Sequence, residues 1–253
     1  MKIVFHEDFH DHTYASDSAS AKGRMKAIMD VFSGISNYEI IKPQCAERED
    51  VLRAHSEAYV ANLEKDVKLF HMAFLAAGGA VTASEQAYIG NPSFACIRPP
   101  GHHASRTSAW GYCYLNNMGI AILKLIHDGK IRNAFILDFD LHTGDGNIDV
   151  LADCADVDVF NPYEGSREGF LKAVESRTKA IEKTDIIAVS AGFDGYEYDL
   201  GGRFKTSDYY FIGCFLKACA KRLCFGRRFA LLEGGYYQPD LGKNVLAFCE
   251  GFE

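Results

Sequence analysis

The stretch that most constrains the fold of this 253-residue chain is an apolar run that ends in acids and one histidine. Residues 134–137 read Ala-Phe-Ile-Leu, which is typical of a strand buried on both faces of a parallel sheet. Asp138, Asp140 and His142 follow this run, and Asp145 lies between two glycines. Because ligands bind at the carboxyl ends of strands in such sheets, we expect a binding site here.

The residue types after this strand favour a metal site. Side chains alternate along an extended backbone, so we expect Asp138, Asp140 and His142 to point the same way. Two carboxylates and one imidazole suit Zn²⁺, with Fe²⁺, Co²⁺ or Mn²⁺ as alternatives, better than Ca²⁺. The competing interpretation is a helix-capping Asp-Gly turn after a buried strand. That turn leaves three acids and a histidine within eight positions unexplained, so we favour the metal.

Length and composition describe an ordinary globular chain. The 253 residues are enough to bury one large core, so we expect one domain over residues 1–253. The chain is 48% hydrophobic and 24% charged, within the usual range for such proteins. A net charge of −7 gives no sign of a nucleic-acid partner and favours a cationic substrate.

The cysteines and the first residues indicate where such a protein works. Eight cysteines include no C-x-x-C pair, and Cys214, Cys219 and Cys224 are spaced as small core residues of a helix. Residues 1–5 read as a strand and not as a signal peptide, and we expect no apolar run of membrane-spanning length. These features predict a protein of the reducing cytoplasm with no membrane partner, and they leave its oligomeric state open.

Strand and helix patterns alternate along the chain. Strands are expected at residues 2–5, 38–41, 93–97, 134–137, 157–160, 186–190 and 229–232. Helices are expected at residues 22–32, 69–88, 117–128, 168–183, 207–223, with Ser207 as the cap, and 242–252, and one or two short helices within residues 47–63. The small residues 76–80 allow close packing of one helix against a sheet. This alternation predicts an α/β fold with a parallel sheet and helices on both faces.

Other polar side chains follow other strands of the predicted sheet. His102 and His103 come after residues 93–97 in a proline-framed loop, where adjacent side chains point in different directions. A proton-transfer pair is therefore a better interpretation than two ligands of one metal. Asp194 follows residues 186–190 and offers a third metal ligand. Tyr236 follows residues 229–232 and offers a phenol for a developing oxyanion, or is simply a loop aromatic.

Five blocks of sequence, taken in order, resemble the signatures of the histone deacetylase superfamily. They are Arg98-Pro-Pro-Gly-His-His-Ala104, Gly111-Tyr-Cys-Tyr-Leu-Asn-Asn117, Asp138-Phe-Asp-Leu-His-Thr-Gly-Asp-Gly146, Ser190-Ala-Gly-Phe-Asp194 and Glu233-Gly-Gly-Tyr236. The last block and the compact chain are most similar to acetylpolyamine amidohydrolases and prokaryotic deacetylase-like enzymes. The resemblance implies an arginase/deacetylase-like α/β fold and a zinc-dependent deacetylase, a hydrolase of linear amide bonds.

The resemblance also implies a metal centre and a substrate wall. Asp140, His142 and Asp194 match the three metal ligands of the family, which implies Zn²⁺, with Fe²⁺ or Co²⁺ as alternatives. Gly111 and Tyr112 match one wall of the channel that holds the acylated side chain, where the family more often has Phe. The substrate would be an acylated amine, either a small molecule or a peptide.

The family's catalytic residues have counterparts here as well. His103 matches the general base and acid, and His102 matches the neighbouring histidine that stabilises transition-state charge. Asp138 matches the partner of His102, and Asp145 matches the partner of His103. Tyr236 matches the tyrosine that polarises the amide carbonyl. The resemblance further implies a K⁺ ion close to Asp138.

The chain departs from the family pattern at three places. Thr143 stands where a second histidine usually follows the ligand. Residues 63–69 form a tight connection where the family has a long loop, which normally carries an acid that grips the substrate. About 45 residues separate Asp145 from Ser190, fewer than usual, and the strand expected at 157–160 matches either of two family strands. We therefore expect shortened loops and a shallower, more open pocket.

Two functions of different classes follow from these patterns. The first is an amidohydrolase that removes an acyl group, acetyl being the first choice, from acetyl-lysine, an acetylpolyamine or a small N-acetyl compound. The alternative is a non-catalytic scaffold that binds acyl-amines and retains the fold. Retention of all expected ligands and of Tyr236 favours the enzyme. An arginase-like enzyme would need a second metal, whereas the chain has one clear ligand set.

Overall fold

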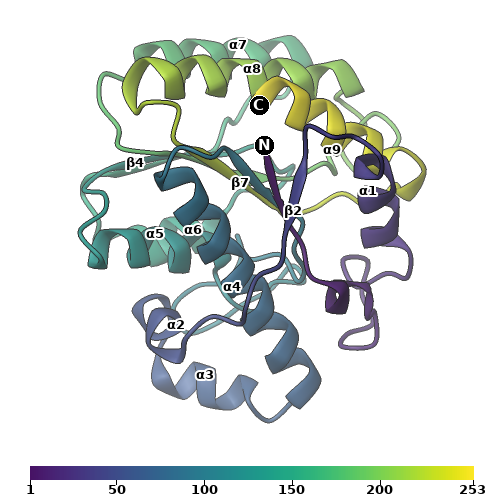
Figure 1. The fold of residues 1–253 in the computed structure, drawn as a ribbon, viewed down its shortest axis with the longest axis vertical. Helices are drawn as coiled ribbons and strands as arrows, with labels where there is room; N and C mark the ends of the chain where they lie inside the picture. Colours follow the sequence, from purple (N-terminus) through teal and green to yellow (C-terminus); the bar gives the residue numbers. More distant parts are fainter.

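The computed structural model describes residues 1–253 and contains one seven-stranded sheet whose strands are all parallel (Figure 1). The strand order is β2-β1-β3-β7-β6-β4-β5. The strands are β1 (Lys2–Val4), β2 (Glu39–Ile41), β3 (Ser93–Ala95), β4 (Ala134–Asp138), β5 (Val157–Phe160), β6 (Ile187–Ala191) and β7 (Arg228–Leu232). The predicted parallel α/β fold is therefore confirmed, and the strand at 157–160 forms the edge beside β4.

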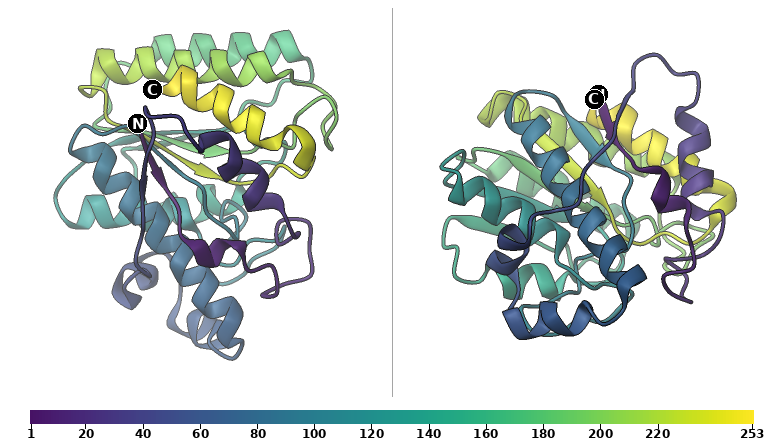
Figure 2. Two further views of the ribbon diagram at one scale, coloured as in Figure 1. Left: turned by 45° about the vertical axis from the view of Figure 1, so that its right-hand side comes forward. Right: turned by 60° about the horizontal axis from the view of Figure 1, so that its bottom comes forward.

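Helices cover both faces of this sheet. The layer at the top and right of Figure 1 holds α1 (Arg24–Phe32), α7 (Arg167–Ala180), α8 (Thr206–Leu223) and α9 (Gln238–Phe252). The other layer holds α4 (Val67–Tyr88), α5 (Asn117–His127) and α6 (Asp145–Leu151), with α2 (Arg48–Ala54) and α3 (Glu57–Leu63) beyond them. A short 3₁₀ helix, η1 (Glu7–His10), follows β1. The two termini lie side by side (Figure 2), and the amino group of Met1 pairs with Glu253 at 3.0 Å.

The order of the strands determines where the polar side chains gather. Strands β3, β7, β6 and β4 are neighbours in the middle of the sheet, although they are far apart in the sequence. Every residue of these four strands is buried, as expected for strands covered by helices on both faces. Parallel strands all end at the same edge, so the segments that follow these four strands meet there.

Several local expectations need correction. Lys205, and not Ser207, is the N-cap of α8, because Asp208 accepts a hydrogen bond from the Lys205 backbone N–H and so closes the first turn. Helix α9 begins at Gln238, four residues before the expected start, with a proline in its first turn. Helix α6 and the helix η1 were not among the expected elements; both are at most seven residues long and have too few positions for a periodic pattern.

The connections expected to be short are short. Helix α3 ends at Leu63 and α4 begins at Val67, so three residues join them.

Cys219 and Cys224 are buried and Cys214 is half-buried, and all eight cysteines are free thiols. Cys224 lies just after the end of α8, so only part of the predicted helical cysteine set packs in the core.

Helix α4 corrects one expectation and explains another. Its 22 residues are long and apolar enough to cross a membrane by length and composition, contrary to the expectation of no such run. However, 61% of its most apolar window is buried inside the protein, which is typical of a core helix. The small residues of the helix pack on two sides: Gly79 faces Ile97 near the sheet, whereas Gly78 faces the backbone of residues 44–46.

The close approach at Gly78 gives a stability prediction. A Cβ at this position would lie 1.9 Å from the carbonyl oxygen of Gln44, and backbone cannot move aside as a side chain can. Gly78→Ala gains about 1 kcal/mol of helix propensity but brings overpacking that costs about 1–3 kcal/mol or more. We therefore expect a lower midpoint of thermal unfolding, measured by circular dichroism. Gly165→Ala is the control, since nothing lies within 4 Å of its Cβ position; equal midpoints in both variants would contradict the packing argument.

Candidate active site

Three potential metal ligands converge at the ends of β4 and β6. Asp140 and His142 follow β4, and Asp194 follows β6. Their ligand atoms all lie within 4.8 Å of one another. The Nδ1 atom of His142 lies 3.2 Å from an oxygen of Asp140 and 3.1 Å from Oδ2 of Asp194. The structure thus brings together the three side chains that the sequence predicts as ligands.

The charges of this group fit a divalent cation. Asp140 and Asp194 are buried carboxylates, and burial together with the charge of Asp140 raises the pKa of Asp194 to about 6. Hydrogen bonds to both acids raise the pKa of His142 to about 10, so the acids favour positive charge between them. Oδ2 of Asp194 is buried and has no hydrogen-bond partner other than the nearby Nδ1 of His142, as expected for an atom that binds a metal ion. Two oxygens and one imidazole nitrogen form a donor set that Zn²⁺ accepts.

His102 is fixed beside this group by a buried carboxylate. Its Nδ1 lies 3.1 Å from Oδ2 of Asp138, and its Nε2 lies 3.9 Å from Asp140. Burial by itself lowers the pKa of His102, but the charges of Asp138 and Asp140 raise it well above the usual range. His102 is therefore held in its cationic form.

His103 has a different partner and a different charge. Its Nδ1 lies 2.6 Å from Oδ1 of Asp145, at the start of α6. Burial and the charge of His102 lower the pKa of His103 to about 4, although Asp145 opposes this shift. A neutral imidazole that donates from Nδ1 to a carboxylate keeps Nε2 as a proton acceptor. The two neighbouring histidines are thus placed for different tasks.

Trp110 supports the second pair and was not foreseen from the sequence. Its Nε1 donates to Oδ2 of Asp145 at 2.8 Å, and its ring lies 3.8 Å from that of His103, centroid to centroid. Trp110 is the single tryptophan of the chain and precedes Gly111 in a family-like block. Its place next to this block was the one sequence feature that could have marked Trp110 as a site residue. Sequence spacing could not show that its indole reaches Asp145.

Gly111, Tyr112 and Tyr236 border the same cavity. The cavity has a volume of about 290 Å³ and is lined by Pro100, His102, His103, Trp110, Gly111, Tyr112, His142, Leu200, Gly234 and Tyr236. Gly111 has φ 59°, and a Cβ there would lie 2.5 Å from the ring of His103, so only glycine fits. Tyr112 also has a positive φ, 66°, and its ring meets that of Tyr236 edge-on at 6.0 Å. A cavity of this size is large enough for a small-molecule ligand or for one side chain of a larger partner.

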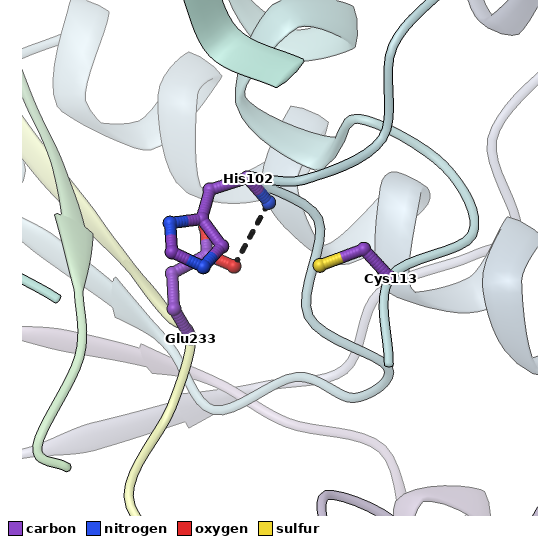
Figure 3. Close-up of side chains that lie close together, drawn as sticks. All are labelled: His102, Cys113 and Glu233. Carbon is purple, nitrogen blue, oxygen red and sulfur yellow. Dashed lines mark hydrogen bonds between the residues drawn. The ribbon is translucent and has the colours of Figure 1, made fainter. Parts of the chain in front are cut away.

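Glu233 is a second residue that the sequence did not single out, although it belongs to the Glu-Gly-Gly-Tyr block. It is buried, and its carboxylate accepts hydrogen bonds from the backbone N–H groups of Gly101 at 2.8 Å and His102 at 3.2 Å. Figure 3 shows the bond from His102. The Ser190 hydroxyl donates to its other oxygen at 3.0 Å. Glu233 thus ties the histidine loop to the ends of β6 and β7.

His102, Cys113 and Glu233 also lie close enough together to hold a metal ion, as Figure 3 shows. Their atoms are engaged elsewhere, however: Nδ1 of His102 pairs with Asp138, and both oxygens of Glu233 accept hydrogen bonds. Burial raises the pKa of the Cys113 thiol well above its usual range, whereas a metal ligand must be a thiolate. The group of Asp140, His142 and Asp194 fits a metal better.

Two geometric expectations from the sequence were wrong in detail. Strand β4 ends at Asp138, so strand alternation does not orient Asp140 and His142; the loop that follows turns them toward each other. The rings of His102 and His103 do not diverge but lie 4.0 Å apart and border one cavity, although they pair with different acids. Both carboxylate oxygens of Asp138 accept hydrogen bonds from N–H groups. The K⁺ ion near Asp138 stays a prediction.

The fold and this site define an α/β protein whose acids and histidines meet at the carboxyl edge of a parallel sheet. The sequence model of the histone deacetylase domain matches residues 18–170, more than half of the chain. A probable deacetylase of Archaeoglobus fulgidus is 30% identical over an alignment of 312 residues, covering 99% of this chain and 86% of the relative. The chain belongs to the histone deacetylase family, and it is a hydrolase of that family. Membership implies a divalent metal ion, typically zinc.

Two further similarities agree with this assignment. The acetylpolyamine amidohydrolase of Mycoplana ramosa is 29% identical over 63% of this chain and 56% of the relative. The crystal structure of the HDA15 HD domain has the same fold, with a TM-score of 0.84 and 20% identity over 100% of this chain and 90% of that chain. The Archaeoglobus alignment is longer than this chain, so that relative contains segments that are absent here. This agrees with the expectation of shortened loops.

The ligand assignment predicts the metal content of two variants. Wild type should bind one divalent ion per chain, and Asp194→Ala should lose it, because a buried oxygen donor is removed from a three-ligand set. Metal per chain is measured by plasma mass spectrometry after dialysis, with circular dichroism to verify the fold. Asp185→Ala, which removes a carboxylate bound to backbone N–H groups of Arg132 and Asn133, is the control and should keep the ion. Stoichiometric metal in Asp194→Ala would refute the assignment.

Proposed function

We propose that the protein is a zinc-dependent amidohydrolase that removes a short acyl group, acetyl above all, from an amine. One observation carries the proposal: a cavity of about 290 Å³ is bordered by His142, by both differently paired histidines and by Tyr236. A hydrolase needs a nucleophile, a proton carrier and an oxyanion partner at one place, and these side chains supply the protein's share of each role.

Asp140, His142 and Asp194 would hold the metal ion. When bound, such an ion lowers the pKa of a coordinated water from 15.7 to about 7 and polarises a carbonyl oxygen. Leu141 and His142 donate backbone N–H groups to Asp194 at 3.0 Å and to Asp140 at 3.0 Å, so the acids are oriented before any ligand arrives. This preorganisation keeps the three donors in one arrangement during the reaction.

The two histidines have different tasks in the reaction. Neutral His103 accepts a proton from the attacking water at Nε2, while Asp145 stabilises the imidazolium that forms. The same proton then passes to the departing amine nitrogen, which leaves as a neutral amine. His102, held cationic between Asp138 and Asp140, stabilises negative charge that develops in the transition state.

The substrate is proposed from the cavity and from the family. The small cavity and the net charge of −7 favour a slender, positively charged amine product. Acetyl-lysine peptides, a monoacetylated diamine and a small neutral N-acetyl amine cover the three proposed substrate types. The test is release of acetate from each of them by zinc-loaded protein. No turnover with any of the three, together with measurable binding of one, would favour the scaffold alternative.

The roles of the histidines differ in a measurable way. His103→Ala should reduce kcat by about 10²–10⁴, the usual contribution of general acid–base catalysis. His102→Ala should reduce kcat less, because its charge assists the transition state without carrying the proton. Both variants should retain the metal ion, since neither side chain belongs to the ligand set. Equal and mild losses in the two variants would contradict the assignment of His103 as the base.

Tyr236 provides a test of catalysis as opposed to binding. Burial raises the pKa of its phenol, so it stays protonated and can donate to the oxyanion. Tyr236→Phe should cut kcat by about 10²–10³ with little change in KM, because this bond strengthens mainly in the transition state. The comparison uses wild type and Tyr236→Phe with equal metal content. An unchanged kcat would remove Tyr236 from the mechanism.

A further inference from the structure

Asp199 connects the loop after β6 to the backbone of Tyr236. Its Oδ2 accepts hydrogen bonds from the backbone N–H groups of Tyr236 at 2.6 Å and Tyr237 at 2.7 Å. Its Oδ1 accepts the N–H of Leu200 at 2.8 Å. One carboxylate therefore binds three backbone donors on two segments that are remote in sequence.

The segment that carries Asp199 is itself tightly bound. It begins at Asp194, whose backbone carbonyl accepts the N–H of Gly201 at 2.8 Å. The Asp199 N–H donates to the carbonyl of Tyr196 at 2.9 Å, and Glu197 donates to Phe204 at 2.8 Å. Because these bonds close the loop on itself, the Asp199 carboxylate has a fixed position relative to Asp194.

The loop that carries Tyr236 is held from its other side by Arg24. This buried guanidinium donates to the carbonyl of Glu233 at 2.6 Å and to that of Gly235 at 2.8 Å. Its Cζ also lies 5.7 Å from the centre of the Tyr236 ring. Arg24 thus binds the carbonyls that precede Tyr236, whereas Asp199 binds the amide of Tyr236 itself. The backbone of Tyr236 is therefore clamped between a buried cation and a carboxylate.

We propose that Asp199 is a positioning residue that aims the Tyr236 phenol at the reacting carbonyl. This inference rests on the proposed function, in which Tyr236 donates to the oxyanion. An oxyanion donor works only when it lies at hydrogen-bond distance from the developing charge, and a misplacement of about 1 Å costs roughly 10²-fold in rate. Asp199 itself touches no reacting atom and acts through the position of Tyr236.

A purely structural role must be distinguished from this one. Tyr237 is the N-cap of α9, so Asp199 also places a negative charge near the first turn of a helix, which stabilises helices in general. A capping role would lower stability and lower activity regardless of which residue stands at position 236. A positioning role would affect activity only while the Tyr236 hydroxyl is present.

A double-mutant cycle separates the two roles. We expect Asp199→Ala to reduce kcat by about ten- to a hundred-fold with little change in KM or in metal content. In the Tyr236→Phe background the same change should reduce kcat by no more than about two-fold, since no hydroxyl remains to be aimed. Asp199→Asn keeps one side-chain acceptor oxygen and should recover part of the loss. Each variant is assayed on the acetyl-lysine peptide or the monoacetylated diamine, whichever wild type hydrolyses faster.

The control is Asp185→Ala. Asp185 also accepts hydrogen bonds from two successive backbone N–H groups, of Arg132 at 2.7 Å and of Asn133 at 3.1 Å. However, it precedes β6 and therefore lies at the amino-terminal ends of the strands, away from the site. The Asp185→Ala variant should have a lower free energy of unfolding but an unchanged kcat. An equal fold-loss from Asp199→Ala in the wild-type and Tyr236→Phe backgrounds would overturn the positioning role and leave the proposed function intact. An unchanged kcat in Tyr236→Phe alone would refute the role of Tyr236, and the role of Asp199 with it.

Discussion

The site depends on the repulsion between two buried carboxylates, Asp140 and Asp194. The ligand atoms of the two acids lie within 4.8 Å of each other. Two negative charges this close in a low-dielectric interior repel each other strongly unless a cation or several hydrogen bonds offset them. The chain supplies backbone donors to both acids, including the Gly234 N–H to Asp140 at 2.9 Å, and sets the imidazole of His142 between them. The remaining Asp194 oxygen has no hydrogen-bond partner other than this imidazole. A cation between the two acids would offset this repulsion, and for this reason we propose the metal at this position.

That arrangement follows from the sheet. The strand order places the ends of β3, β7, β6 and β4 side by side, so loops distant in sequence supply three histidines and Tyr236 to one cavity. Asp140 and Asp194 are buried next to His142, which lines that cavity. Glu233 connects three of these strand ends through buried hydrogen bonds. The scaffold thus fixes the backbone of the histidine loop. The charges of Asp138 and Asp140 then raise the pKa of His102, whereas burial and the charge of His102 lower the pKa of His103.

The sequence was sufficient for the fold class and for the side chains that gather at the site. Buried strands and amphipathic helices have clear periods, and an acid after a buried strand is a strong local signal. It was insufficient for contacts between remote loops. Nothing in the spacing shows that Trp110 reaches Asp145 or that Asp199 reaches the Tyr236 amide. The orientation of Asp140 and His142 was also beyond pattern rules, because the strand ends before them and a loop directs them.

The proposed metal centre consists of Asp140, His142 and Asp194. The most direct measurement is a crystal structure of the zinc-loaded protein with anomalous data at the zinc edge. We expect one strong peak bonded to oxygens of Asp140 and Asp194 and to Nδ1 of His142, at about 2.0–2.2 Å. A peak among His102, Cys113 and Glu233, or the absence of zinc from both groups, would contradict it.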